Sequence, residues 1–194
     1  MKSGARALGV AESFSQGERS VLGGAVVRRD RVADGFVFGT CTVGGTDATA
    51  AVERLWADLG REDVRALLLS GIAPAWFNLL DLRSLHDRVD RPVVSVSFEA
   101  SPGLEPALRE AFSGEALDRR LRTYRALPSR RRLDVNGEDV YVRAVGVDDD
   151  GAADLVRAFT PEGGRPEPLR VARLAARAAR RLADGATGLD DGDT

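Results

Sequence analysis

Two short, almost continuously apolar runs constrain the fold of this chain more than any other feature. The apolar residues are Val64, Ala66, Leu67, Leu68 and Leu69 in the first, and Val93, Val94 and Val96 in the second. Runs of this kind are typical of parallel strands that are buried on both faces of a sheet. Parallel strands need a crossover connection, and a helix is predicted between the two runs, with apolar positions at Leu79, Leu82, Leu85 and Val89. The centre of the chain therefore predicts two parallel strands joined by a crossover helix.

The residues before this unit predict a three-stranded antiparallel meander followed by a helix. The strand-like runs are Ala5–Ala11, Ser20–Arg28 and Gly35–Val43, and their connections are short enough for hairpins. Apolar residues then recur at helical spacing from Ala48 to Leu59. We expect Thr46 or Asp47 to cap the first turn of this helix.

The residues after it predict a helical and hairpin half. Helical patterns cover Gly103–Phe112 and Glu115–Leu127, and two strands, Arg131–Val135 and Glu138–Val145, flank the turn Asn136-Gly137. A last helix is predicted from near Pro168 to about Ala183. This order of elements predicts an α/β fold with a ribonuclease H-like mixed sheet. We expect one domain over residues 1–183 and a disordered acidic tail over residues 184–194.

Composition excludes several classes of protein and site. A formal net charge of −2 gives no strong overall field for polyanions. A single cysteine, Cys41, excludes an intrachain disulfide, and with His86 as the only histidine there is no ligand set for structural zinc. Any metal would need oxygen ligands. No apolar stretch reaches the length of a membrane span and no secretory signal is recognisable, so we expect a cytoplasmic protein.

One apparent nucleotide-binding motif is interpreted as a coincidence. Residues 39–46 match the phosphate-binding P-loop pattern except at the lysine, where Gly45 stands. The missing lysine is the residue that neutralises phosphate, and the first half of the match falls on a predicted strand. We therefore expect no nucleotide P-loop.

Arginines form a stripe on the last predicted helix. Arg170, Arg173, Arg177 and Arg180 recur at steps of three and four, with Arg181 beside them, and a second cluster runs from Arg119 to Arg132. Such a stripe could follow a phosphate backbone. The simpler interpretation, which we favour for the last helix, is a solvated face opposite apolar residues such as Val171 and Leu182.

Several sequence words, spread over residues 6–183, resemble one archaeal family. They are LGVAESF at residues 8–14, DG at 34–35, GTDAT at 45–49, SGIAPAWFNLLD at 70–81, RPV at 91–93 and PEPLRVA at 166–172. Together they resemble the family called domain of unknown function ninety-nine. That family is similar in fold to endonuclease V, a metal-dependent nuclease that acts beside deaminated bases.

The resemblance implies a metal site where the first strand and the first parallel strand end, and it implies Mg²⁺ or Mn²⁺ there. The carboxyl ends of these neighbouring strands should bring residues 11–12 beside residues 70–71. The resemblance implies two aspartates after Gly9-Val10, but this chain has Ala11 and Glu12. It also allows an aspartate before Gly71, but this chain has Ser70. Metal binding is therefore expected to be weak.

The candidate site residues follow from that junction. Glu12, Asp47 and Asp81 would be catalytic if the protein is active, and Glu12 and Asp47 would hold the metal. Candidate ligand-binding residues are Ser70, Gly71, Asn78, Arg170, Arg173 and Arg177. For Asp47 and Asp81 we favour structural roles: Asp47 can cap its helix, and Asn78 with Asp81 can form a capping pair for the next.

Three functions remain open. The leading hypothesis is binding of DNA, RNA or a nucleotide-like ligand with weak or lost nuclease activity. The second is an active Mg²⁺- or Mn²⁺-dependent nuclease with a rearranged site. The third is a non-catalytic protein interaction module. Nothing in the sequence indicates an oligomeric state.

Overall fold

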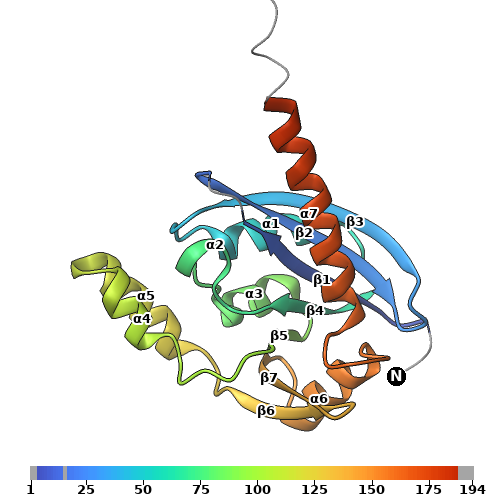
Figure 1. Cartoon of the computed structure of the whole chain (residues 1–194). Coiled ribbons are helices and arrows are strands. Elements are labelled where there is room, and N and C mark those ends of the chain that lie inside the picture. The colour runs from blue at the N-terminus through green and yellow to red at the C-terminus, as the bar shows by residue number, and fades with distance from the viewer. Residues whose placement is uncertain (1–3, 15–16, 188–194) are drawn as a thin grey trace, which may run out of the picture.

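A seven-stranded mixed sheet forms the centre of the molecule in the computed structural model, which describes residues 4–14 and 17–187 (Figure 1). The strand order is β3-β2-β1-β4-β5-β7-β6. The strands are β1 (Arg6–Ser13), β2 (Arg19–Arg28), β3 (Ala33–Thr42), β4 (Val64–Ser70), β5 (Val93–Ser97), β6 (Arg131–Val135) and β7 (Glu138–Val145).

The pairing of the strands confirms the predicted α/β fold. β1, β2 and β3 form an antiparallel meander, in which Val10 pairs with Gly24. On its other side β1 is parallel to β4, and β4 is parallel to β5. The predicted hairpin at Asn136-Gly137 joins β6 to β7, and β7 continues the sheet beside β5. The two apolar runs are thus the two parallel strands at its centre.

Helices cover both faces of the sheet. On one face, α1 (Ala48–Leu59) and α3 (Leu82–Val89) pack over a core that includes Leu8 and Val10 of β1. On the other, α6 (Asp149–Ala158) and α7 (Glu167–Thr187) cover the alternate residues, such as Ala7 and Ala11 (Figure 1). The chain between these layers also forms α2 (Pro74–Phe77), α4 (Glu105–Ala111) and α5 (Gly114–Ala126).

α7 lies against β1 and β2 because glycines allow a close approach. A Cβ atom on Gly9 would lie 2.3 Å from the carbonyl carbon of Pro168. A Cβ atom on Gly23 would lie 2.8 Å from the backbone nitrogen of Ala176. These glycines let the helix cross the sheet almost at backbone contact. They fix the position of the arginines that α7 carries.

Three parts of the structure differ from the sequence-based predictions. α6 was not predicted, since its first turn is polar and contains Gly151; Asp148 caps it by accepting a hydrogen bond from the Gly151 N–H at 2.8 Å. α2 was not predicted either. α7 continues to Thr187, beyond the expected end at Ala183, and the rest of the predicted tail lies outside the described residues. Within the described ranges, no helix is both long and apolar enough to cross a membrane.

Candidate functional site

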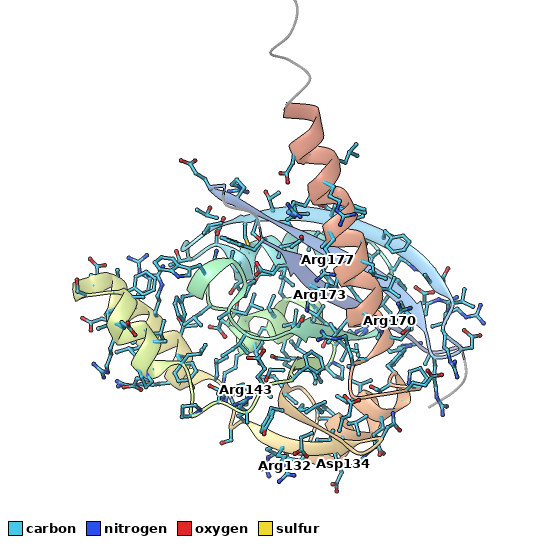
Figure 2. The ribbon with its side chains drawn as sticks, viewed as in Figure 1. Arg132, Asp134, Arg143, Arg170, Arg173 and Arg177 are labelled. Atoms are coloured by element: carbon cyan, nitrogen blue, oxygen red, sulfur yellow. The ribbon has the colours of Figure 1, made fainter. Side chains whose placement is uncertain are left out.

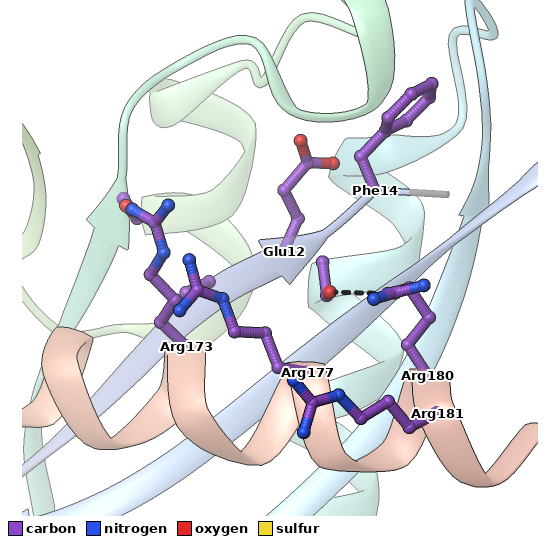
Figure 3. A pocket seen from close by; sticks show the side chains of 9 residues that line it. Glu12, Phe14, Arg173, Arg177, Arg180 and Arg181 are labelled. Carbon is purple, nitrogen blue, oxygen red and sulfur yellow. Dashed lines mark hydrogen bonds between the residues drawn. The ribbon is translucent and has the colours of Figure 1, made fainter. Parts of the chain in front are cut away.

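The carboxyl ends of β1 and β4 meet beneath α7 and open into a cavity of about 490 Å³ (Figure 3). Ala11 to Phe14 of the first strand and its end line one side, and Ser70 lines another. The remaining wall consists of Arg173, Arg177, Arg180 and Arg181. We call this space the arginine cavity. It lies at the junction that the sequence predicts and includes Glu12, Ser70, Arg173 and Arg177 among the candidate residues.

Few carboxylates pair with the guanidinium groups of the arginine cavity. Arg180 donates hydrogen bonds to Ser13 Oγ at 3.0 Å and to Asp184 Oδ2 at 2.8 Å. Arg173, Arg177 and Arg181 make no hydrogen bond or ion pair with any described residue, and Arg173 and Arg177 point toward the end of β1 (Figure 3). Burial, and to a smaller extent the like charge of Arg173 and Arg177, lowers the pKa of Arg165. The cavity is therefore locally cationic although the whole chain is nearly neutral.

Glu12 stands in the cavity wall, but its carboxylate is directed away from α7 (Figure 3). One oxygen, Oε2, accepts hydrogen bonds from Ser20 Oγ at 2.9 Å and from the backbone N–H of Ala75 at 2.5 Å. The side chain therefore connects β1 to β2 and to α2. This structural use was not anticipated from the sequence.

Asp47 has a structural role that differs from the predicted one. It occupies the N-cap position of α1, but its side chain makes no capping hydrogen bond. Instead its carboxylate accepts hydrogen bonds from the N–H and hydroxyl of Thr42, at 3.0 Å each, and from Asn78 Nδ2 at 2.7 Å. Burial raises the pKa of Asp47, but the hydrogen bonds from Thr42 and Asn78 outweigh it and leave the pKa below its ordinary value.

Asn78 and Asp81 do not form the predicted capping pair. Asp81 alone caps α3, accepting hydrogen bonds from the N–H groups of Arg83 and Ser84. Asn78 is fully buried, and its Oδ1 accepts from the N–H of Ala48 at 2.9 Å. Asn78 therefore satisfies the first turn of α1, which lies 30 residues earlier in the chain. Local spacing gave no indication of this contact.

The segment Pro74–Phe77 has an unusual backbone. Ala75, Trp76 and Phe77 have φ values of 48°, 55° and 60°, so three successive residues with side chains adopt the left-handed conformation. This costs about 1–2 kcal/mol per residue and persists only where the surroundings fix it. Glycine, which usually occupies such positions, is absent here. We call these three residues the left-handed turn.

Two remaining predicted residues lie outside the arginine cavity. Arg170 points along α7 beside Arg173 and Arg177 (Figure 2), but it does not line the cavity, and it pairs with both carboxylate oxygens of Glu167 at 2.6 and 2.7 Å. Gly71, with φ of 82°, donates its N–H to Val96 O at 2.9 Å. It lines a separate cavity of about 280 Å³, together with Tyr124 and Tyr141.

The carboxylates of this region do not fit a two-carboxylate magnesium clamp. Ala11 and Ser70 supply none at the strand ends, Glu12 Oε2 already accepts two hydrogen bonds, and Asp47 accepts several. Across residues 4–14 and 17–187, no group of three or more His, Cys, Asp or Glu side chains could hold a metal ion. Mg²⁺ prefers several oxygen ligands in near-octahedral geometry. The described residues of the arginine cavity instead present a cationic surface.

The sequence of this chain is similar to those of archaeal proteins. The sequence profile of a family described as endonuclease dU matches residues 3–180. A UPF0215 protein of Pyrobaculum aerophilum is 33% identical over 178 residues, which cover 90% of this chain and 94% of that protein. A UPF0215 protein of Thermococcus kodakarensis is 32% identical over 163 residues, covering 83% of this chain and 82% of that protein.

Comparison with solved structures agrees. A protein of unknown function from Archaeoglobus fulgidus superposes with a TM-score of 0.81 at 26% identity, covering 90% of this chain and 97% of that one. Human endonuclease V gives a TM-score of 0.62 at 16% identity, covering 93% and 86%. Ciona intestinalis endonuclease V, solved with a DNA that contains an inosine, gives 0.61 at 13% identity, covering 92% and 87%. The fold is therefore that of endonuclease V.

Proposed function

Because this chain belongs to the endonuclease dU family, we propose that it binds nucleic acid in the arginine cavity and that its nuclease activity is weak or lost. In this proposal, Arg173 and Arg177 hold the phosphate backbone at the ends of β1 and β4. Ser70 lines the same cavity and offers a hydroxyl for a phosphate oxygen. Phosphate contacts of this kind position a nucleic acid without reading its sequence.

The observation that carries the proposal is the set of unpaired guanidinium groups in the arginine cavity. Elsewhere on the described surface, several arginines pair with a carboxylate, as Arg170 does with Glu167 and Arg125 with Glu105. Arg173, Arg177 and Arg181 have no such partner among the described residues. Guanidinium is the side-chain group best suited to bidentate contact with phosphate. A wall of uncompensated guanidinium groups inside a concave site therefore favours a polyanionic ligand.

The comparisons suggest which nucleic acids to test. The Ciona endonuclease V structure holds DNA with an inosine, and the name of the family refers to deoxyuridine. Both are products of base deamination. We therefore include inosine- and deoxyuridine-containing strands among the ligands proposed for this protein.

Metal dependence and location belong to the proposal as well. Glu12 is the one carboxylate in the wall of the arginine cavity among the described residues, so we propose that Mg²⁺ or Mn²⁺ binds weakly. We also propose a cytoplasmic location, which suits a buried thiol such as Cys41.

Fluorescence anisotropy with labelled DNA and RNA oligonucleotides tests the binding proposal. The double variant Arg173→Ala/Arg177→Ala should bind single-stranded DNA about tenfold more weakly, because two charge-assisted contacts are lost. Its slope of log affinity against log salt, measured between about 50 mM and about 200 mM, should fall by about 1.4, or about 0.7 per phosphate contact. Arg170→Ala is the matched control, since it removes a guanidinium from the same helix outside the cavity.

Cleavage is followed in the same samples with and without Mn²⁺. We expect retention without metal-dependent products. Products from inosine- or deoxyuridine-containing strands would contradict the loss of activity and favour the rearranged nuclease. If neither DNA nor RNA is retained at low salt, or if Arg170→Ala weakens binding as much as the double variant, the arginine cavity is not the binding site.

A further inference from the structure

The left-handed turn holds Trp76 in an exposed position, directly after Ala75, whose N–H donates to Glu12 in the wall of the arginine cavity. More than half of this side chain, 53%, is accessible to solvent, although it is the largest apolar side-chain type. One side of the ring packs against Phe112, with centroids 5.2 Å apart, and against Phe77 at 5.8 Å. Gly44 also lies against the ring, since a Cβ atom on that glycine would be 2.8 Å from Trp76 Cε3, and the rest of the indole faces solvent. A solvated tryptophan on a strained backbone indicates a position fixed for something other than core packing.

Contacts from three separate elements fix the turn. Glu12 of β1 accepts the N–H of Ala75 at 2.5 Å, and the N–H of Gly44, between β3 and α1, donates to the carbonyl of Ala75 at 2.7 Å. Arg120 of α5 donates to the carbonyl of Phe77 at 3.3 Å and to that of Gly45 at 3.1 Å. Hydrogen bonds from distant parts of the sequence therefore offset the cost of the left-handed backbone conformation.

Arg120 has an unusual environment for an arginine in a basic cluster. It is only 5% exposed, and its guanidinium also stacks over the ring of Phe112 at 3.8 Å. Burial and the nearby Arg119 lower its pKa. Its hydrogen bonds go to backbone carbonyl groups, namely those of Phe77, Gly44, Gly45 and Ala116. Arg120 is thus a positioning residue for the turn and is not part of the surface charge.

The turn and the arginine cavity share Glu12. This residue lines the cavity, and it bonds directly to the residue before Trp76 in the chain. In the arrangement proposed below, a strand whose phosphates contact Arg173 and Arg177 continues past Glu12, so that one of its bases reaches the indole. Binding sites for single strands combine these two features, since a cationic groove holds the backbone while aromatic rings stack on the bases.

We propose that Trp76 stacks on an unpaired base of the nucleic acid, and that Glu12 and Arg120 hold the left-handed turn that presents it. This inference rests on the proposed function. It assigns Glu12 to positioning through its hydrogen bond to Ala75 and needs no metal bound to its carboxylate. We expect no preference for a particular base, because every base has a π-face that can stack on an indole.

Intrinsic fluorescence reports on the contact directly. The chain contains two tryptophans, Trp56 and Trp76. In a Trp56→Phe background, titration with an unlabelled thymidine oligonucleotide should quench and shift the emission of Trp76. Anisotropy with a labelled strand, measured separately, gives the affinity. Trp76→Ala should weaken that affinity about tenfold, while Trp76→Phe should retain most of it. Phe36→Ala is the control, because Phe36 is 51% exposed on the edge strand β3 and does not line the cavity.

Two variants of Glu12 separate positioning from metal binding. Glu12→Gln retains an oxygen that can accept the N–H of Ala75, so it should bind the strand and respond in fluorescence like the parent protein. Glu12→Ala loses the acceptor and should show a changed Trp76 emission before any ligand is added. If Glu12→Gln is as impaired as Glu12→Ala, the positioning role is wrong. Circular dichroism of each variant verifies that it folds.

The outcomes distinguish this inference from the proposed function. Binding that depends on Arg173 and Arg177, with no change in Trp76 emission and no loss in Trp76→Ala, would overturn the stacking proposal and leave the proposed function intact. Absence of binding at low salt would overturn both. Quenching of Trp76 together with loss of affinity in Trp76→Ala supports both.

Discussion

Individual polar residues in this protein satisfy the backbone of distant elements more often than their local sequence suggests. Asn78, Asp47 and Glu12 were each predicted as site or capping residues. In the structure Asn78 binds α1, Asp47 binds Thr42, and Glu12 binds the left-handed turn. A buried N–H group without a partner is costly, so these side chains are constrained by the backbone groups they serve.

Substitution of Asn78 tests this constraint. Asn78→Ala would leave the N–H of Ala48, the carbonyl of Thr42 and an oxygen of Asp47 without their present partner. We expect the free energy of unfolding to fall by about 3 kcal/mol, because each buried unsatisfied group costs about 1–3 kcal/mol. Urea denaturation at neutral pH measures the loss. A change below about 0.5 kcal/mol, the usual range for surface positions, would mean that water replaces the amide.

The conservative variant Asn78→Asp adds a pH dependence. It would place a second carboxylate against Asp47, and like charges raise the pKa of one member of such a pair. A group whose pKa is raised by folding contributes stability at low pH that is lost as the pH rises. Asn78→Asp should therefore gain stability, relative to wild type, as the pH falls from neutral toward the ordinary range of aspartate. An unchanged difference between the two proteins across this range would contradict the contact.

At the scale of elements, hydrophobic patterning was a good guide wherever a segment is regular. The parallel strands β4 and β5, the meander and the hairpin follow the predicted order, because burial on one or both faces gives each strand a recognisable pattern. α6 was not predicted, because Asp148 to Gly151 resemble a loop. Its buried residues Ala152, Leu155 and Val156 nevertheless have helical spacing. The left-handed turn has no local signal at all, because contacts from Glu12 and Arg120 determine it.

The docking of α7 leads to a prediction about one glycine. Gly9→Ala would place a methyl group 2.3 Å from the backbone of Pro168, which has no flexible side chain to move aside. We expect a loss of stability of about 3 kcal/mol or more and a weaker affinity for nucleic acid, because α7 carries the arginines. Thermal unfolding and anisotropy measure the two effects. Gly35→Ala is the matched control, since its nearest contact would be an ordinary 3.5 Å. Equal stabilities for the two variants would contradict the close packing.

At the scale of the whole molecule, the location of the candidate site was easier to predict from the sequence than the residues that form its walls. The meeting of residues 11–12 with residues 70–71 was predicted from the strand order, and the family resemblance implied a site there; Ala11, Glu12 and Ser70 line the cavity. Its arginine wall comes from a helix far along the chain, and nothing in the spacing of that helix shows which strand it covers. Arg170, Arg173 and Arg177 are all exposed, as the favoured interpretation of a solvated face expects, and Arg173 and Arg177 also line the cavity.

The expected single domain stays a prediction, and its cooperativity can be measured. α4 and α5 lie to one side of the sheet (Figure 1), yet Arg120 connects α5 to the loop after β3. We therefore expect one unfolding transition, with coincident curves from far-ultraviolet circular dichroism and tryptophan fluorescence. An earlier fluorescence transition, reporting release of the turn around Trp76, would show that α4 and α5 unfold separately.

The contact between Arg180 and Ser13 joins residues that are 167 positions apart in the chain. During synthesis, β1 to β7 can form before the residues of α7 have left the ribosome, but the arginine wall cannot. A nascent chain at that stage has the ends of β1 and β4 without the arginines of α7. The apolar face of β1 and β2 that α7 covers is still exposed to solvent. The proposed capacity to hold a polyanion would thus be acquired in the same step that covers this face, and an unfinished chain would not be captured by nucleic acid through this cavity.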